Sequence, residues 1–228
     1  MNSNSLSING LDSGDYWDFE NGYHFFSDSS RFGKILSQYE LLKKVLDVPG
    51  DFVELGVYKG CSAIRLATFR ELLETQLKRK IYLFDAFGAF PRENSSLAND
   101  LKYVDRFEMQ GGDGLSVDDI QRIFQFKNMH NIECIKGDVF DTIPAFLRNN
   151  KQIRFSYVHL DLDVYEPTKL CLDLLWPHVS PGGIIVFDDY NGFEGATLAI
   201  EEFLALHPSL SIQLGSYTKS PSYIRKTI

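Results

Sequence analysis

Short apolar runs alternate with amphipathic segments along most of the chain. Seven runs have the length and composition of strands: 51–56, 80–85, 131–136, 157–162, 184–187, 210–217 and 222–226. Helical spacing of apolar residues, or a helix signal, marks the segments between them: about 30–47, 60–78, 116–127, 144–147, 167–176 and 196–206. This alternation predicts an α/β fold with a doubly wound, mostly parallel seven-stranded sheet and a closing β-hairpin.

The first expected strand runs directly into a glycine turn. Its sequence is Glu54-x-Gly56-x-x-x-Gly60, and an amphipathic helix follows. Glycines let a turn approach a ligand closely and let the next helix pack against the strand. The spacing is neither the GxGxxG of dinucleotide folds nor a phosphate-binding P-loop. An acid with this turn suits a cationic, hydroxyl-bearing ligand, although packing alone also places glycines after strands.

Acidic residues follow each expected parallel strand. They are Glu54, Asp85, Asp138, Asp161, Asp163, Asp188 and Asp189. Parallel strands end at one edge of a sheet, where α/β proteins bind ligands. Asp161 and Asp163 also share a face, because side chains alternate along a strand. Either acidic pair alone is equally well explained as a turn or cap, but seven acids at one edge predict a site for a hard cation.

Other side chains near these acids leave alternatives open. His159 shares the face of Asp161 and Asp163, so it can orient a carboxylate or a substrate, but a structural histidine is the preferred interpretation. Tyr165, Tyr190 and Phe193 suit a sugar pocket and core packing equally well.

Two segments fall outside the alternation. Residues 1–29 are polar yet contain Tyr16, Trp17, Phe19, Tyr23, Phe25 and Phe26. We expect an N-terminal extension whose aromatic side chains pack onto the domain, with a lid over the substrate as the alternative, and a single domain over 30–228. Residues 86–114 predict a long irregular loop that covers the substrate.

Composition narrows the class of protein. The chain has 228 residues, 44% hydrophobic and 24% charged, with a net charge of −8, which predicts one globular domain without a nucleic-acid surface. The three cysteines (Cys61, Cys134 and Cys171) lack metal-site spacing and favour buried thiols in a reducing compartment. Because no long apolar run or signal pattern is present, we expect a cytoplasmic protein with no membrane partner.

Four motifs together resemble the macrocin O-methyltransferase family. They lie at 48–60, 84–87, 159–168 and 180–190. The resemblance implies the class I methyltransferase fold, which is Rossmann-like, with an antiparallel C-terminal strand. It also implies S-adenosyl-L-methionine and Mg²⁺ as cofactors and a sugar hydroxyl of a small-molecule acceptor as the methylated group. Dimerisation is implied only by the resemblance.

The same resemblance assigns roles residue by residue. The cofactor-binding positions would be Glu54, Gly56, Tyr58, Gly60, Ser62, Asp85, Ala86, Gly137, Asp138, Val139 and Asp161. Among them, Asp85 would hold the ribose and Asp138 would face the adenine, although Asp138 also suits a turn cap. The metal ligands would be Asp161, Asp188 and Asp189, and Asp163 would be the catalytic base.

Three other functions stay open at this stage. Asp161-x-Asp163 also fits the metal site of nucleotide-sugar glycosyltransferases, which do not require the glycine turn or the second acidic pair. A catechol-type O-methyltransferase would share metal and cofactor, but such enzymes typically carry a lysine where this chain has Val164. A fold that only binds a ligand is disfavoured by the complete set of acids.

Overall fold

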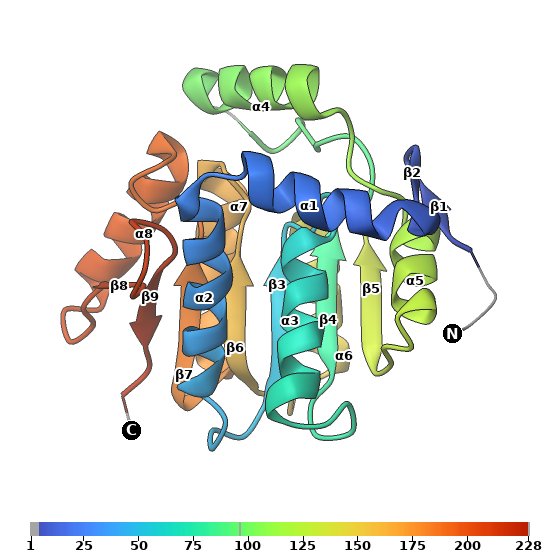
Figure 1. Cartoon of the computed structure of the whole chain (residues 1–228). Coiled ribbons are helices and arrows are strands. Elements are labelled where there is room, and N and C mark those ends of the chain that lie inside the picture. The colour runs from blue at the N-terminus through green and yellow to red at the C-terminus, as the bar shows by residue number, and fades with distance from the viewer. Residues whose placement is uncertain (1–4, 96, 228) are drawn as a thin grey trace.

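A seven-stranded sheet forms the centre of the computed structural model, which describes residues 5–95 and 97–227 (Figure 1). Its spatial order is β5-β4-β3-β6-β7-β9-β8. In chain order the strands are β3 (Asp51–Leu55), β4 (Ile81–Asp85), β5 (Ile132–Lys136), β6 (Phe155–Leu160), β7 (Val179–Phe187), β8 (Gln213–Leu214) and β9 (Ser222–Arg225). The first five pair in parallel, and β9 is antiparallel to both of its neighbours. The predicted sheet and closing hairpin are confirmed.

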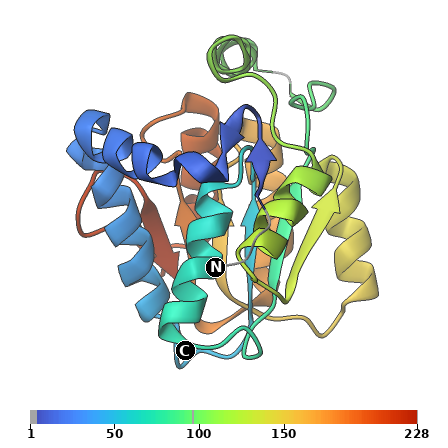
Figure 2. The same ribbon diagram turned by 45° about the vertical axis from the view of Figure 1, so that its right-hand side comes forward.

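Helices cover both faces of this sheet. One face carries α2 (Ser29–Lys43), α3 (Cys61–Leu73) and α5 (Val117–Phe126); the other carries α6 (Val139–Asn149), α7 (Tyr165–Leu175) and α8 (Glu194–Leu206) (Figures 1 and 2). Because both faces are covered, a central strand such as β6 is buried along its whole length and consists mostly of apolar and aromatic residues. None of the helices in the described ranges has the length and apolar character to cross a bilayer.

Residues 86–114 contain a helix, so the expectation of an irregular loop is wrong. The helix is α4 (Ala98–Gly111), which lies above the edge where the parallel strands end (Figure 1). Only Asp100 and Val104 are buried along it. A single apolar contact position leaves too narrow an apolar stripe to stand out as a periodic pattern.

The N-terminal segment crosses the same edge of the sheet as α4 (Figures 1 and 2). It forms a short hairpin, β1 (Ser7–Ile8) and β2 (Leu11–Asp12), a 3₁₀ turn η1 (Ser13–Asp15) and the helix α1 (Tyr16–Phe26). The expected packing of its aromatic side chains is wrong, since α1 contains no buried residue and Phe26 is 86% exposed. Tyr23 makes a ring contact with Phe32 of α2, at 5.0 Å between centroids. The boundary at 29/30 stays a prediction.

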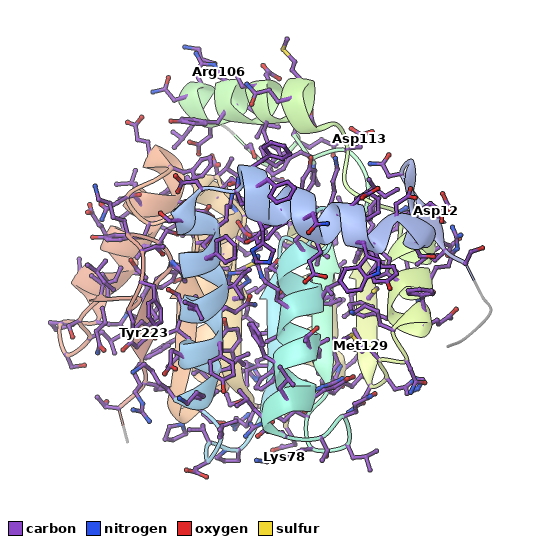
Figure 3. All side chains as sticks on the ribbon, in the orientation of Figure 1. Asp12, Lys78, Arg106, Asp113, Met129 and Tyr223 are labelled. Atoms are coloured by element: carbon purple, nitrogen blue, oxygen red, sulfur yellow. The ribbon has the colours of Figure 1, made fainter. Side chains whose placement is uncertain are left out.

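A buried arginine ties together the opposite edge of the sheet, where Figure 3 labels the neighbouring Lys78. Arg79 is 3% exposed, and its Nε lies 2.8 Å from Glu74 Oε2. Its Nη atoms donate to the main-chain carbonyls of Val45, Leu46, Val48 and Gly50. A planar guanidinium can satisfy this many acceptors at once, so Arg79 joins the loop before β3 to the end of α3.

We expect Arg79→Met to lower the free energy of unfolding by about 3–5 kcal/mol, because it removes the buried partner of Glu74 and the donor to several main-chain carbonyls. Urea denaturation measures this loss. Lys78→Met is the matched control: Lys78 also pairs with Glu74, but its side chain is 49% exposed, so about 1 kcal/mol or less is expected. Equal losses in the two variants would contradict the role given to Arg79.

Candidate active site

A cavity of about 450 Å³ opens at the carboxyl ends of the parallel strands, with α4 forming part of its wall. Its size lies in the range typical of small-molecule sites. Most of the predicted site residues line it: Gly56, Tyr58, Asp85, Ala86, Gly137, Asp138, Val139, Asp161, Asp163, Asp188 and Asp189. The topology therefore brings the glycine turn and the acidic strand ends into one cavity.

Three predicted cofactor residues do not line this cavity. Glu54 is fully buried inside β3, where its Oε1 accepts a hydrogen bond from Ser62 Oγ at 2.5 Å. Gly60, with φ of +79°, precedes α3, and a Cβ there would lie 2.7 Å from Ile120 Cδ1. The structure gives each of the three a local packing or hydrogen-bonding role, and direct contact with a cofactor stays a prediction for them.

The glycine turn is held by Asp85 at the end of β4. Asp85 Oδ2 accepts from the N–H groups of Val57 at 2.7 Å and Tyr58 at 2.9 Å, and Oδ1 accepts from Phe87 N–H at 2.5 Å. A carboxylate has about four lone-pair positions, so roughly one remains for a ligand hydroxyl. Gly56 has φ of +86°, and a Cβ there would lie 1.7 Å from the carbonyl oxygen of Asp161, so only glycine fits.

Asp138 has a structural role at the next strand end. Its Oδ1 accepts from Phe140 N–H at 3.0 Å and caps α6, and its Oδ2 accepts from Asn94 at 2.9 Å. Gly137 before it has φ of +139°. The capping alternative is confirmed, and Asp138 also lines the cavity, so contact with an adenine stays a prediction.

The four acids after β6 and β7 form one cluster, hereafter the acid cluster: Asp161, Asp163, Asp188 and Asp189. They converge because the two strands pair in parallel, with Leu160 opposite Phe187. Ligand atoms of Asp161, Asp163 and Asp189 lie within 4.8 Å of one another, and so do those of His159, Asp161 and Asp188. Asp161 belongs to both groups, whereas Asp188 belongs to one and Asp189 to the other. Neither group therefore contains all three predicted metal ligands.

Burial and mutual repulsion shift the pKa values in the acid cluster upward. Burial, with the charge of Asp188, raises the pKa of Asp163 to about 6, although a side-chain hydrogen bond with Asp189 acts in the opposite direction. Burial, followed by neighbouring carboxylates, raises the pKa of Asp161 and of Asp189 well above the usual range. Lys34 of α2 offsets part of the charge, since its Nζ lies 2.5 Å from Asp188 Oδ2.

His159 lies behind the acid cluster and is 5% exposed. Its Nδ1 is 3.5 Å from Glu54 Oε2. Burial lowers the pKa of His159, but the carboxylates of Glu54, Asp161 and Asp188 outweigh it, and the pKa is raised overall. The residue is therefore not an isolated core histidine.

Helix α4 is anchored to the domain at both of its ends. Asp100, 2% exposed, accepts from the N–H of Tyr165 at 2.9 Å and from the N–H of Gly195, at the starts of α7 and α8. A carboxylate is favourable at helix N-termini. At the other end, Lys59 Nζ donates to the carbonyl of Gly111 at 2.5 Å. Sequence reasoning missed Asp100 because α4 itself was not predicted.

Two aromatic pairs lie at the cavity wall, and one is Tyr58 with Phe107, at 4.8 Å between ring centroids. The rings of Tyr103 on α4 and Phe193 before α8 are 5.0 Å apart, and both residues line the cavity. Phe193 was one of three aromatic candidates. The others are placed elsewhere: Tyr165 hydroxyl donates to Glu202 at 2.8 Å, and Tyr190 packs against the apolar core. Tyr103 had no sequence signal, since its partner is distant along the chain.

Comparison with known proteins agrees with this geometry. Residues 34–216 match the family model of macrocin O-methyltransferases. The chain belongs to this family. A relative from Streptomyces olivaceus, 8-demethyl-8-(2,3-dimethoxy-alpha-L-rhamnosyl)-tetracenomycin-C 4'-O-methyltransferase, is 31% identical over 63% of this chain and 54% of its own. Demethyldecarbamoylnovobiocin O-methyltransferase from Streptomyces niveus is 26% identical over 70% and 60%. The chain thus spans only somewhat over half the length of these relatives.

Solved structures of methyltransferases share the fold. The calicheamicin methyltransferase CalS11 superposes with a TM-score of 0.69 at 25% identity, covering 92% of this chain and 85% of its own. The O-methyltransferase NovP gives a TM-score of 0.73 at 23% identity, covering 86% and 80%. The class I methyltransferase fold is therefore confirmed.

The raised pKa values predict an unusual pH dependence for the metal-free protein. An acid whose pKa is higher in the folded state binds more protons when folded, between its ordinary value near 4 and its raised value. The stability that protonation of Asp163 contributes is therefore present at low pH and is lost as pH rises through about 6. The pKa values of Asp161 and Asp189 are also raised, so their contributions change with pH in the same direction. With EDTA present, we expect Asp189→Asn to raise Tm relative to wild type more at about pH 7.5 than at about pH 5.

Asp173→Asn, at an exposed position on α7, is the control and should give the same small difference at both pH values. A Tm difference for Asp189→Asn that is independent of pH, or larger at the acidic pH, would contradict the assigned electrostatics.

Proposed function

We propose that this chain is an S-adenosylmethionine- and Mg²⁺-dependent O-methyltransferase that acts on a hydroxyl group of a sugar-containing small molecule. The proposal rests on one observation: the glycine turn, which Asp85 holds in place, and the acid cluster line the same cavity. The names of three relatives, which refer to tetracenomycin, novobiocin and mycinamicin compounds, support a glycosylated natural product as acceptor.

The residues of the glycine turn fit the proposed cofactor. Gly56 lines the cavity, and Asp85 keeps about one acceptor position free for a ligand hydroxyl. S-adenosylmethionine, when bound, supplies an electrophilic methyl group on a sulfonium. Two more distant proteins of the same fold, at 14% and 12% identity and TM-scores of 0.56 and 0.55, were solved with S-adenosylhomocysteine and S-adenosylmethionine; at this identity they support the fold alone.

The acid cluster fits a hard divalent cation. Its donors are carboxylate oxygens, which favour Mg²⁺, Mn²⁺ or Ca²⁺ over Zn²⁺. The cluster also carries more negative charge than Lys34 can balance. Asp161, Asp188 and Asp189 would hold the ion. A divalent cation, when bound, supplies a Lewis acid that makes the acceptor hydroxyl more acidic.

Asp163 is the proposed general base. A sugar hydroxyl is a weak nucleophile until its proton leaves, and a well-placed base contributes roughly 10²- to 10⁴-fold. Asp163 lies at the cavity wall with φ of +63°, and its N–H donates to Asp189 Oδ2 at 3.0 Å, which fixes the backbone before α7. A pKa of about 6 leaves Asp163 ionised at neutral pH and more basic than an ordinary aspartate. It would take the hydroxyl proton as the methyl group transfers to oxygen.

Two observations bear on the alternative reactions. Family membership favours methyl transfer over glycosyl transfer. Val164, at the position of the catechol-type lysine, is completely buried, so it presents no base to the cavity. Tyr103 and Phe193 offer aromatic faces for a sugar ring, and α4 would keep water from the reacting atoms.

The cysteines bear on where the enzyme works. Cys61, Cys134 and Cys171 are free thiols, but only Cys171 is buried as expected; Cys134 is partly buried and Cys61 is exposed. Burial raises the pKa of Cys134 to about 11, so its reactive thiolate is suppressed. These thiols support a reducing compartment, and we propose the cytoplasm.

Asp163→Asn tests the proposed chemistry. It should lower kcat by about 100-fold or more, because the amide cannot accept the proton, while affinity for S-adenosylhomocysteine and Mn²⁺ stays within a few-fold of wild type by calorimetry. Asp161→Asn and Asp188→Asn should instead weaken Mn²⁺ binding. Asp173→Asn is the exposed control. Near-normal turnover by Asp163→Asn would remove it from the base role, and absence of methyl transfer from S-adenosylmethionine to any glycoside tested would argue against the proposed reaction.

A further inference from the structure

We propose that Glu54 and His159 form a buried positioning pair, which fixes the carboxylates of Asp161 and Asp188 for binding a divalent cation. The inference rests on the proposed function, because the metal site belongs to it. The family resemblance assigned Glu54 to cofactor binding, whereas this inference assigns it to orienting His159. His159 in turn acts on the metal site by holding the carboxylates of Asp161 and Asp188.

The pair is built into the sheet. Glu54 on β3 lies directly opposite His159 on β6 in the parallel register. Glu54 is fully buried, and one of its oxygens is held by Ser62 Oγ at 2.5 Å. The other oxygen, Oε2, faces His159 Nδ1 at 3.5 Å. Within the described part of the chain neither of these two atoms has another hydrogen-bond partner.

The imidazole also reaches the acid cluster. A nitrogen of His159 and carboxylate oxygens of Asp161 and Asp188 lie within 4.8 Å of one another. Because Nδ1 faces Glu54, we assign Nε2 to the side of the two aspartates. A histidine that links a buried carboxylate to a metal-site group is a recurrent way of orienting that group.

The remaining contacts of the two aspartates do not fix both side chains. Asp161 is tied through its backbone, since its N–H donates to the carbonyl of Leu55 at 2.9 Å. Asp188 Oδ2 lies 2.5 Å from Nζ of Lys34, which belongs to the helix α2 and not to the sheet. His159 is the polar group on the sheet side that approaches both carboxylates. A fully buried Glu54 is costly unless it is paired, and orienting His159 accounts for its presence.

A double-mutant cycle tests the pair. Glu54→Gln, His159→Leu and the double variant are titrated with Mn²⁺ by electron paramagnetic resonance at one fixed pH, with S-adenosylhomocysteine affinity measured in parallel. Each single variant should weaken Mn²⁺ binding about tenfold or more. The double variant should be no weaker than His159→Leu alone, because Glu54 acts through the imidazole. Affinity for S-adenosylhomocysteine should not change.

Tyr157→Phe is the matched control, since Tyr157 is completely buried on the same strand and its hydroxyl has no hydrogen-bond partner among residues 5–95 and 97–227. It should leave Mn²⁺ affinity unchanged. If His159→Leu does not fold, His159→Gln replaces it in the cycle, and its amide should preserve part of the affinity.

The outcomes separate the two proposals. Additive losses, unchanged Mn²⁺ affinity in folded variants, or nitrogen hyperfine coupling that shows His159 bound directly to Mn²⁺ would each overturn the positioning role. If the wild type binds Mn²⁺ while the variants bind it equally well, this inference alone fails. If the wild type binds no Mn²⁺ and EDTA does not affect turnover, the metal part of the proposed function fails and the inference fails with it.

Discussion

The functional edge of this protein depends on one constraint: the fold brings several carboxylates together, and these carboxylates repel one another. Parallel pairing of β6 and β7 delivers the acid cluster to one place, and burial removes much of the water that would screen it. Lys34 supplies one positive charge from α2. The cluster therefore favours either protonation or a bound cation, and the neighbouring Glu54–His159 pair determines how its carboxylates are held.

The opposite edge of the sheet has no comparable conflict. There Arg79 satisfies main-chain carbonyls and Glu74 together, and two apolar clusters, one on each face, fill the space between sheet and helices. In Figure 3 this edge, marked by Lys78, lies at the far end of the molecule from Arg106 on α4. Stability and function are thus separated along the strands, so the functional edge tolerates buried charge.

Much of this arrangement could be predicted from the sequence, because strands and their terminal residues carry local signals. The spacing of apolar residues and the lengths of the apolar runs predicted the sheet. The order of the motifs placed the glycine turn and the acid cluster at one edge. What could not be predicted depends on pairing between distant segments. Glu54 faces His159 through the register of β3 and β6, and α4 is anchored through Asp100 to helices far along the chain. Neither relationship leaves a periodic pattern.

The central claim is that the glycine turn and the acid cluster serve one transfer reaction in one cavity. A crystal structure with S-adenosylhomocysteine and Mg²⁺ tests it most directly. We predict the homocysteine part beside Gly56, the ribose at Asp85, the metal on Asp161, Asp188 and Asp189, and the sulfur directed toward an open volume beside Asp163. Cofactor bound away from the glycine turn, or its sulfur directed away from Asp163, would contradict the account.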